Sequence, residues 1–429
     1  MAPADLSTGS NEDWLPLAGL RVIDVGTRIS APFCAGLLGE LGAEVIKVEL
    51  PAGGDFMRTI GPFVPDPDDP NGPGYSLFWS VEGRGRKGAT CDLRTTEGQE
   101  LFRRLAGVSD VVCENFRPGT MESWHLGPDD LDKSLVYVRV SVFGQDGPYS
   151  QRPGLDRMGI AYGGLLHLTG YPDRPPVRPG VTISDYLTGV FAATGALAAL
   201  YARDASGSGA DSDQGGERAH ATERGAVIDA PLYASVLRVL EWTVAGYDRL
   251  GIVRAREGNR LATSAPIDNY PSADGRYVCI VAGSDANFAR LCSAMGRPEL
   301  TSDPRFRTLS DRASRADEIN STVASWTMSL DASEIEQACI AAGVPVARAY
   351  SAADIASDPH FEARGDLVEV DDPVAGPVLQ QAPFPRLRGK RPAAPRGAPR
   401  LGEHNRYVWC DLAGLSEDEL AELIDAGVV

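Results

Sequence analysis

Short apolar runs alternate with helical segments through the first third of the chain, and this alternation constrains the fold more than any other feature. Residues 20–25 form an apolar run, 31–41 have helical spacing that ends at Gly42, and 44–48 are again strand-like. A strand, a helix and a second strand in this order predict a βαβ unit with a right-handed crossover, and therefore a parallel sheet.

The same alternation continues downstream. The further predicted strands are 89–93, 111–114 and 135–142. Thr95 and Thr96 are predicted to cap a helix that runs to about Ala106, with Gln99 as the capping-box partner three residues after Thr96. The sequence thus predicts an α/β fold with a large, doubly wound, parallel-sheet (Rossmann-like) domain. Ligands are expected at the carboxyl ends of its strands.

Changes in composition divide the rest of the chain. Residues 1–14 are a predicted mobile tail, and 15–203 form the N-terminal part of the large domain. Residues 204–224 contain almost no apolar side chains and are a predicted flexible linker. A smaller α+β domain is predicted over 225–340. Within it, 226–247 and 286–340 are expected to be helical and 277–281 a strand; later, the Pro- and Arg-rich stretch 384–402 is expected to be extended.

The charge balance excludes some partners. The chain carries 41 Lys and Arg against 59 Asp and Glu, a formal net charge of −18. Such an acidic chain argues against a general nucleic-acid binder and against docking on an anionic membrane. The most apolar segment, 186–201, is predicted to be a buried helix rather than a membrane span, because it is short and broken by Gly189 and Gly195.

Cysteine and histidine spacing predicts no metal site. Seven cysteines include no CxxC pair, and no two of the five histidines have metal-ligand spacing, so we expect reduced thiols. No secretory signal is visible, and a cytoplasmic location is expected. The turn Gly26–Ser30 lacks GxGxxG and the chain lacks GxSxG, which argues against a nicotinamide site and an α/β-hydrolase.

Two groups of residues are candidates for ligand binding. Arg84, Arg86 and Lys87 precede a predicted strand and could clamp a phosphate group, or they form an ordinary solvated turn. Asn115 and Phe116 follow a predicted strand end, where an amide and an aromatic ring can bond to and stack on a base. The alternative is a turn with a core phenylalanine.

Asp185 is the candidate nucleophile. It lies between an extended segment and an apolar helix, so it is either the helix N-cap or a carboxylate placed for nucleophilic attack. The N–H groups of the helix N-terminus are expected to lower its pKa and keep it ionised.

Four blocks of the chain closely resemble the family III CoA-transferases, a family that includes formyl-CoA transferase, carnitine CoA-transferase, the succinyl-CoA-dependent dicarboxylate transferases and the 2-methylacyl-CoA racemases. The blocks are LAGLRVIDVGTRISAPFCAGLLGELGAEVIKVELPAGGD, RGRKGATCDLRTTEGQELFRRLAGVSDVVCENFRPGT, SVFGQDGPYSQRPGLD and RPGVTISDYLTGVFAATGALAAL. The resemblance covers about residues 15–200 and 225–408.

The resemblance implies an interlocked homodimer, in which each chain is threaded through a ring made by the other. It also implies that 341–429 provide a linker and the C-terminal part of the large domain.

The resemblance also implies a mechanism. The motif Asp of the family falls on Asp185, which attacks an acyl-CoA thioester and forms a covalent aspartyl intermediate. Acyl-CoA and a small carboxylic acid are then the substrates, with no tightly bound cofactor. The implied coenzyme A contacts are Arg28, Ile29, Ser30, Arg84, Arg86, Lys87, Asn115 and Phe116.

Three features favour small dicarboxylic acids such as succinate. The block around Asp185 looks most like the dicarboxylate branch, and the glycine-rich loop of formyl-CoA transferase is absent from 257–266. Polar side chains also lie near the motif. Arg157 is the candidate partner of a second substrate carboxylate, with Tyr162 and His167 nearby; alternatively, Arg157 is a structural or surface residue.

Two other functions remain open. A 2-methylacyl-CoA racemase pairs its Asp with a His, and in this chain Leu155 stands at the His position. Because racemisation needs two titratable groups, Leu155 argues against it. The second alternative is an inactive CoA-binding module, against which the presence of Asp185 argues.

Overall fold

The computed structural model describes residues 12–13, 15–207, 225–386, 390–391 and 395–429. The chain divides into two compact units. The first comprises Met1–Leu165, Gly180–Glu241 and Gly365–Val429, and the second comprises Leu166–Pro179 and Trp242–Arg364.

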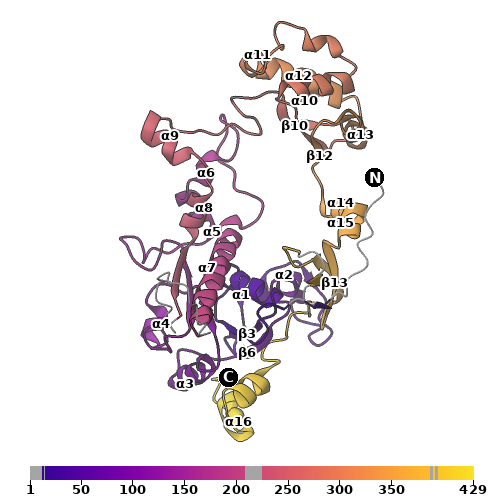
Figure 1. Cartoon of the computed structure of the whole chain (residues 1–429). Coiled ribbons are helices and arrows are strands. Elements are labelled where there is room, and N and C mark those ends of the chain that lie inside the picture. Colours follow the sequence, from indigo (N-terminus) through magenta and orange to yellow (C-terminus); the bar gives the residue numbers. More distant parts are fainter. Residues whose placement is uncertain (1–11, 14, 208–224, 387–389, 392–394) are drawn as a thin grey trace, which may run out of the picture. The chain divides into compact units, whose positions relative to one another are not determined.

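The first unit is built on a parallel sheet of six strands (Figure 1). In spatial order they are β6 (Lys87–Thr90), β3 (Glu44–Glu49), β2 (Arg21–Asp24), β7 (Val111–Glu114), β8 (Val136–Ser141) and β9 (Val227–Pro231). The predicted α/β class with a large parallel sheet is confirmed. The order reverses between β2 and β7, and open α/β sheets bind ligands at such a switch point, beyond the carboxyl ends of the strands.

Successive residues of a strand point to opposite sides of the sheet, so each face presents its own apolar side chains. Helices cover both faces and bury these side chains. Val22 and Val111 are buried with residues of α1 (Ser30–Glu40) and α7 (Ile183–Gly207). Their neighbours Ile23 and Val112 are buried on the other face with residues of α3 (Thr96–Ala106) and the π-helical segment η3 (Arg406–Leu412). The C-terminal helix α16 (Glu417–Asp425) adds Leu420 to this second core.

Strand β9 corrects the predicted start of the small domain. Residues 226–247 were expected to be helical and to belong to a domain over 225–340. Instead Val227–Pro231 pair in parallel with β8, and α8 (Leu232–Arg238) and α9 (Thr243–Leu250) follow. Residues up to 241 therefore belong to the first unit. Periodicity alone does not separate a short edge strand from the helix that continues it.

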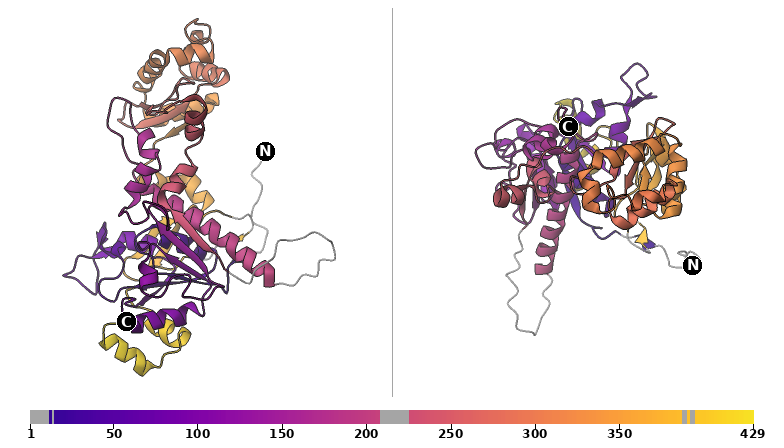
Figure 2. Two further views of the ribbon diagram at one scale, coloured as in Figure 1. Left: turned by 90° about the vertical axis from the view of Figure 1, so that its left-hand side faces the viewer. Right: turned by 90° about the horizontal axis from the view of Figure 1, so that it is seen from above.

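Helix α7 is the long apolar helix expected over 186–201. Ala192, Ala196 and Leu200 are buried, and the helix packs against α1, β8 and α8. Its segment Ile183–Ala205 is long and apolar enough to cross a membrane by length and composition, and 39% of its most apolar window is buried. The core helix of a globular domain passes the same test, so this is weak evidence for a span. The C-terminal end of α7 projects beyond the sheet (Figure 2).

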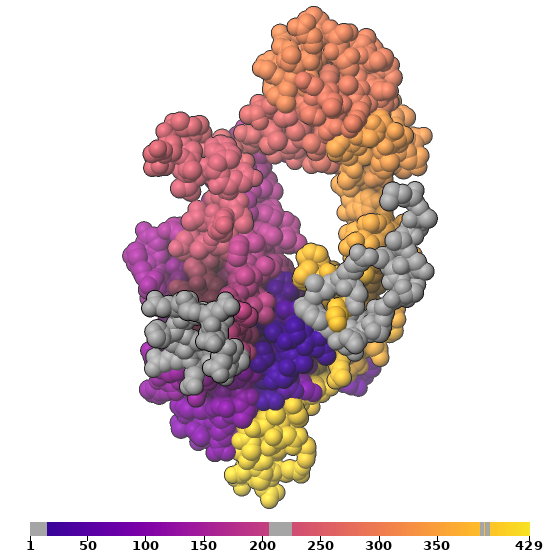
Figure 3. Space-filling view, viewed as in Figure 1, coloured from indigo at the N-terminus to yellow at the C-terminus, as the bar shows by residue number. Residues whose placement is uncertain are grey.

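In the space-filling view, α1 in indigo and α7 in magenta lie next to each other at the surface of the first unit (Figure 3).

Smaller elements surround the sheet. The helical ones are η1 (Phe56–Thr59), α2 (Leu77–Glu82), α4 (Thr120–Ser123) and α5 (Asp156–Tyr162). The paired strands are β4 (Phe63–Val64) with β5 (Tyr75–Ser76), and β13 (Leu367–Asp372) with β14 (Gly376–Gln381).

The second unit contains a small antiparallel sheet of β10 (Ile267–Pro271), β11 (Tyr277–Val281) and β12 (Val346–Arg348). The strand predicted at 277–281 and the helices predicted over 286–340 are observed. The helical elements of this unit are most of α6 (Leu165–Leu168), α9, α10 (Asp285–Ala294), η2 (Pro298–Thr301), α11 (Leu309–Ser314), α12 (Ala316–Thr327), α13 (Ala332–Ala342), α14 (Ala352–Ser357) and α15 (Pro359–Arg364).

The predicted tail and linker fall largely outside the described residues. From the predicted tail 1–14, the structure describes β1 (Glu12–Asp13), which pairs with β15 (Lys390–Arg391). From the predicted linker 204–224, it describes the last residues of α7. Parts of the predicted extended stretch 384–402 also lie outside the described residues.

Candidate active site

The turn between β2 and α1 lies at the carboxyl end of a central strand and is held by a buried ion pair. Lys47 Nζ lies 2.9 Å from Asp55 Oδ2, and it donates a hydrogen bond to the carbonyl of Gly26. Asp55 Oδ1 accepts the backbone N–H of Arg28 at 3.1 Å. Burial alone would lower the pKa of Lys47, but the carboxylates of Asp24 and Asp55 outweigh it and raise that pKa. Lys47 and Asp55 therefore fix both ends of the turn Gly26–Arg28.

Asn115 braces the same turn from the end of β7. Its side-chain amide donates to the carbonyl of Thr27 at 2.7 Å and accepts the Thr27 N–H at 2.8 Å. It also donates to the hydroxyl of Ser30 at 3.3 Å. The ring of Phe116 packs edge-on against Trp124, with centroids 5.2 Å apart. The structure therefore brings predicted residues from β2 and β7 together at the switch point of the sheet.

Arg28 occupies a special backbone position in this turn. Its φ is +65°, an uncommon conformation for a residue with a side chain, and it is maintained by the contacts of Asp55 and Asn115. The guanidinium lies 4.5 Å from the centroid of the Phe56 ring. The predicted neighbours Ile29 and Ser30 are buried.

Asp185 lies in the first turn of α7. The helix begins at Ile183, so Asp185 is its third residue rather than its N-cap. Its carboxylate makes no hydrogen bond within the described part of the chain. Burial is the main cause that raises its pKa, the negative charge of Asp156 adds to it, and Arg28 opposes both, so that the pKa of Asp185 is raised to about 7. The expectation of a lowered pKa is therefore wrong.

Asp156 connects α5 to the residue before Asp185. It is the first residue of α5 and is only 5% exposed. Its Oδ1 accepts the backbone N–H of Ser184 at 3.0 Å and the Ser184 hydroxyl at 2.7 Å. The first turn of α7 is therefore attached to α5 by two hydrogen bonds to one carboxylate.

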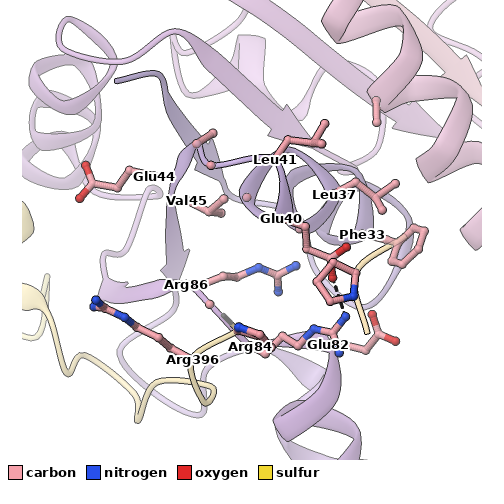
Figure 4. A pocket seen from close by; sticks show the side chains of 18 of the residues that line it. Phe33, Leu37, Glu40, Leu41, Glu44, Val45, Glu82, Arg84, Arg86 and Arg396 are labelled. Atoms are coloured by element: carbon pink, nitrogen blue, oxygen red, sulfur yellow. Dashed lines mark hydrogen bonds and ion pairs between the residues drawn. The ribbon is translucent and has the colours of Figure 1, made fainter. Parts of the chain in front are cut away.

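The three cations Arg84, Arg86 and Lys87 line one cavity of about 1410 Å³ in the first unit (Figure 4). They do not converge on a single point. Arg84 pairs with Glu40 at 2.5 Å, and Lys87 lies 4.7 Å from the centroid of the Tyr407 ring.

Arg86 is only 5% exposed. Its guanidinium donates to the carbonyl of Pro32 at 2.5 Å, and its Nε lies 3.7 Å from Asp24 Oδ2. Arg86 thus belongs to the buried charges beneath the turn.

Two of the three candidate substrate residues are on α5, and the third belongs to the other unit. Arg157 is exposed on α5, directly after Asp156. Tyr162, at the end of α5, is 51% exposed, and its ring contacts those of Phe143 and Tyr233 with centroids 5.2 and 5.1 Å apart. His167 belongs to the second unit.

Sequence reasoning missed four residues of this site: Asp156, Ser184, Lys47 and Asp55. Asp156 and Ser184 stand inside quoted motif blocks, but only the packing of α5 on α7 reveals their contact. Lys47 in a buried strand was a usable signal, because an unpaired buried lysine is very costly and needs a carboxylate partner. Among the described residues, no group of three or more His, Cys, Asp or Glu is placed to hold a metal ion.

Comparison with known proteins gives a consistent result over nearly the whole chain. The model of a family described as CoA-transferase family III matches residues 17–214 and 217–405. The chain is 42% identical to the succinyl-CoA–D-citramalate CoA-transferase of Chloroflexus aurantiacus, over 95% of this chain and 96% of that protein. It is 39% identical to the beta subunit of the succinyl-CoA–L-malate CoA-transferase of the same organism, over 97% and 98%.

A solved structure has the same fold. A CAIB/BAIF family protein from Brucella suis is similar with a TM-score of 0.79 at 31% identity, covering 92% of this chain and 99% of that one.

Proposed function

The chain belongs to CoA-transferase family III, and from this premise we propose that it moves coenzyme A from succinyl-CoA to a second small dicarboxylic acid through a covalent intermediate on Asp185. As a member of the family it is a CoA-transferase, with an acyl-CoA as its substrate. The observation that carries the mechanism is the Asp185 carboxylate, which is partly buried, has no hydrogen bond among the described residues and lies near the cation Arg28.

The first half-reaction removes the donor acid. An oxygen of the Asp185 carboxylate attacks the thioester carbonyl carbon, the C–S bond breaks, and coenzyme A departs as its thiolate. The acyl group is then joined to Asp185 in a mixed anhydride. The thiolate then attacks the Asp185 carbonyl carbon of this anhydride and expels the donor carboxylate. The product is an aspartyl–CoA thioester, so the thioester bond is preserved without net uptake of water or protons.

The second half-reaction reverses these steps with the acceptor acid. The acceptor carboxylate attacks the Asp185 carbonyl carbon and releases the thiolate. The thiolate attacks the acceptor carbonyl of the new anhydride, which yields the new acyl-CoA and frees Asp185. The Asp185 carboxylate is negatively charged before and after each cycle. Arg28, on the fixed turn, supplies a positive charge near it.

The coenzyme A contacts remain proposals. The edge formed by Arg28, Asn115 and Phe116 lies at the switch point of the sheet, where the thioester is expected. Arg84 and Lys87 line the neighbouring cavity of the first unit and are candidate partners for phosphate groups. Arg86 is proposed to act through the buried charges under the turn, since it is almost inaccessible.

Small dicarboxylic acids are the proposed acids because the similar proteins are named for succinyl-CoA with D-citramalate or L-malate. A second carboxylate needs a cation or several hydrogen-bond donors. Arg157 remains our candidate, since it is exposed on α5 next to Asp156.

The racemase and binding-module alternatives are weaker. At the position of the racemase histidine, Leu155 is 54% exposed and offers no titratable group. A binding module has no need of an unbonded, partly buried carboxylate.

We propose an interlocked homodimer as the assembly. Its support is an apolar surface along α1 and α7, with Leu37, Tyr186, Val190 and Leu197 lining the cavity of Figure 4. A partner chain covering this surface would remove it from water. One similar transferase is named as alpha and beta subunits, so a requirement for a second, different chain is the alternative outcome.

The test is an assay of the purified chain alone with succinyl-CoA and a panel of acids: L-malate, D-citramalate, mesaconate, oxalate and carnitine. We expect new CoA thioesters with the small dicarboxylic acids, detected by liquid chromatography with mass spectrometry. Loss of a deuterium from C2 of a 2-methylacyl-CoA without acyl exchange would support the racemase, and binding without reaction would support the module.

A further inference from the structure

The contact between Asp156 and Ser184 is more than a structural link, because only half of the Asp156 carboxylate is used. Oδ1 accepts both the N–H and the hydroxyl of Ser184. Oδ2 is buried and has no hydrogen-bond partner among the described residues. A buried carboxylate oxygen without a donor is unfavourable, and such groups persist where the surrounding structure imposes them.

The packing of α5 on α7 imposes this arrangement. A Cβ atom on Gly159, in the middle of α5, would lie 2.9 Å from Ser184 Oγ and 2.8 Å from the Cβ of Leu232. Only a glycine therefore allows the close approach of α5 to the first turn of α7. Asp156 is fixed by its own helix and cannot turn away from Asp185 without losing both bonds to Ser184.

We propose that Asp156 is a positioning residue for Asp185: its Oδ1 holds the first turn of α7 through Ser184, and its unpartnered Oδ2 keeps a second negative charge beside the nucleophilic carboxylate. The proposal rests on the proposed function of Asp185. It goes beyond that function because it assigns the reactivity of Asp185 to a residue on another helix that forms no bond with the substrate.

Of the acidic groups near Asp185, Asp156 has a carboxylate oxygen that no hydrogen-bond donor of the described residues contacts. The turn after β2 contributes the cation Arg28. The next residue of α7, Tyr186, is an uncharged phenol, because burial and the nearby carboxylates of Glu82 and Asp185 raise its pKa. The hydroxyl of Tyr186 donates to Glu82 Oε1 of α2 at 2.7 Å, so Glu82 is already bonded. Asp156 has no such donor at Oδ2.

The second charge favours bond formation at Asp185. In the free enzyme two carboxylates repel each other. In the anhydride and in the aspartyl–CoA thioester, Asp185 is neutral and the repulsion has gone. A repulsion that raises the free energy of the free enzyme but is absent from the intermediate lowers the activation free energy of the step that joins the two states. The higher basicity of the carboxylate also makes it a better nucleophile.

The experiment titrates Asp185 directly and does not depend on turnover. Protein labelled with ¹³C in the aspartate carboxyl groups is studied by infrared spectroscopy against pH, and the Asp185 band is assigned by its loss in Asp185→Asn. Asp156→Asn removes the charge but retains an acceptor for Ser184. Ser184→Ala removes the hydroxyl contact and leaves the charge, and Asp129→Asn is the control at an exposed aspartate.

We expect the titration midpoint of Asp185 to fall by about one pH unit in Asp156→Asn and to stay within about 0.3 units of wild type in Ser184→Ala and Asp129→Asn. Asp156→Asn should also lower kcat by about three- to tenfold with little change in KM for the acyl-CoA, because the residue does not contact that substrate.

An unchanged midpoint in Asp156→Asn overturns the inference. Asp156→Ser, which keeps a shorter hydrogen-bond acceptor, repeats the test if the Asn variant does not fold. Failure of both neutral variants to fold would make Asp156 a structural residue alone and also overturn it. Lack of CoA transfer by wild type, by contrast, refutes the proposed function and leaves the titration to decide the role of Asp156.

Discussion

At the scale of single residues, the Asp185 carboxylate lies between a negative and a positive neighbour in a site where burial already disfavours charge. Because Asp185 must be ionised to attack the thioester, its pKa sets the lower end of the working pH range. An exposed aspartate would have lost its proton far below neutral pH.

The first prediction follows from the sign of this pKa shift. Since the pKa of Asp185 is raised to about 7, kcat/KM for transfer should rise with pH below that value and level off above it. Arg28→Met should move the midpoint of the pH profile upward, because it removes the cation that favours the ionised form. Initial rates measured from about pH 5.5 to about pH 8.5 test both points. A flat profile across this range would contradict them.

The second prediction concerns Lys47. Lys47→Met leaves Asp24 and Asp55 buried without their main cation, so the free energy of unfolding should fall by about 3–5 kcal/mol in urea denaturation. The matched control is Lys133→Met, which breaks the exposed pair Lys133–Asp129 and should leave the unfolding midpoint unchanged. Equal effects of the two variants would rule out a supporting role of the buried pair.

Part of the site was predictable from residue type and position alone. Asp185 was identifiable because it is an acid at the start of an apolar helix inside a quoted motif. The raised pKa of Asp185 was not predictable, because it comes first from burial in the folded chain and then from the charge of Asp156 on α5, 29 positions away in sequence. The burial of Arg86 was equally invisible, since its partners Asp24 and Pro32 are distant in sequence.

At the scale of elements, the strands inside the sheet were easier to predict than its edge. The runs at 44–48 and 111–114 are dense in β-branched residues and appear as β3 and β7. Edge strand β9 is only partly buried and continues into a helix, so its pattern resembled one long helix. The start of α3 shows a similar limit. Thr95 caps the Gly98 N–H, while Gln99 donates to the carbonyl of Leu93, so the predicted capping box is wrong.

The third prediction tests the contact of α5 with α7. Gly159→Ala forces a methyl group against Ser184 and Leu232, so it should lower the free energy of unfolding by about 1–3 kcal/mol and reduce transfer by displacing the first turn of α7. The control Gly107→Ala adds a methyl group at ordinary contact distance and at a negative φ of −64°. It should change stability by at most about 0.5 kcal/mol. Equal stability and activity in the two variants would refute close packing at Gly159.

At the scale of the whole molecule, the apolar surface along α1 and α7 suggests that the chain does not function alone. The fourth prediction is a particle of about twice 45.6 kDa in sedimentation analysis. Because interlocked chains cannot separate without unfolding, dilution should leave its mass unchanged, whereas refolding from denaturant should slow as the chain concentration falls. A folded, active monomer would contradict the interlocked assembly, and a requirement for a second gene product would contradict the homodimer.

Covalent attachment of Asp185 during transfer can be detected by chemical trapping of the intermediate. Wild-type protein is incubated with succinyl-CoA, treated with hydroxylamine, digested and analysed by mass spectrometry. We expect a hydroxamate on Asp185 that forms only when succinyl-CoA is present and that is absent from Asp185→Asn. A protein that transfers coenzyme A at its normal rate but is trapped at another residue, or at none, would contradict this expectation.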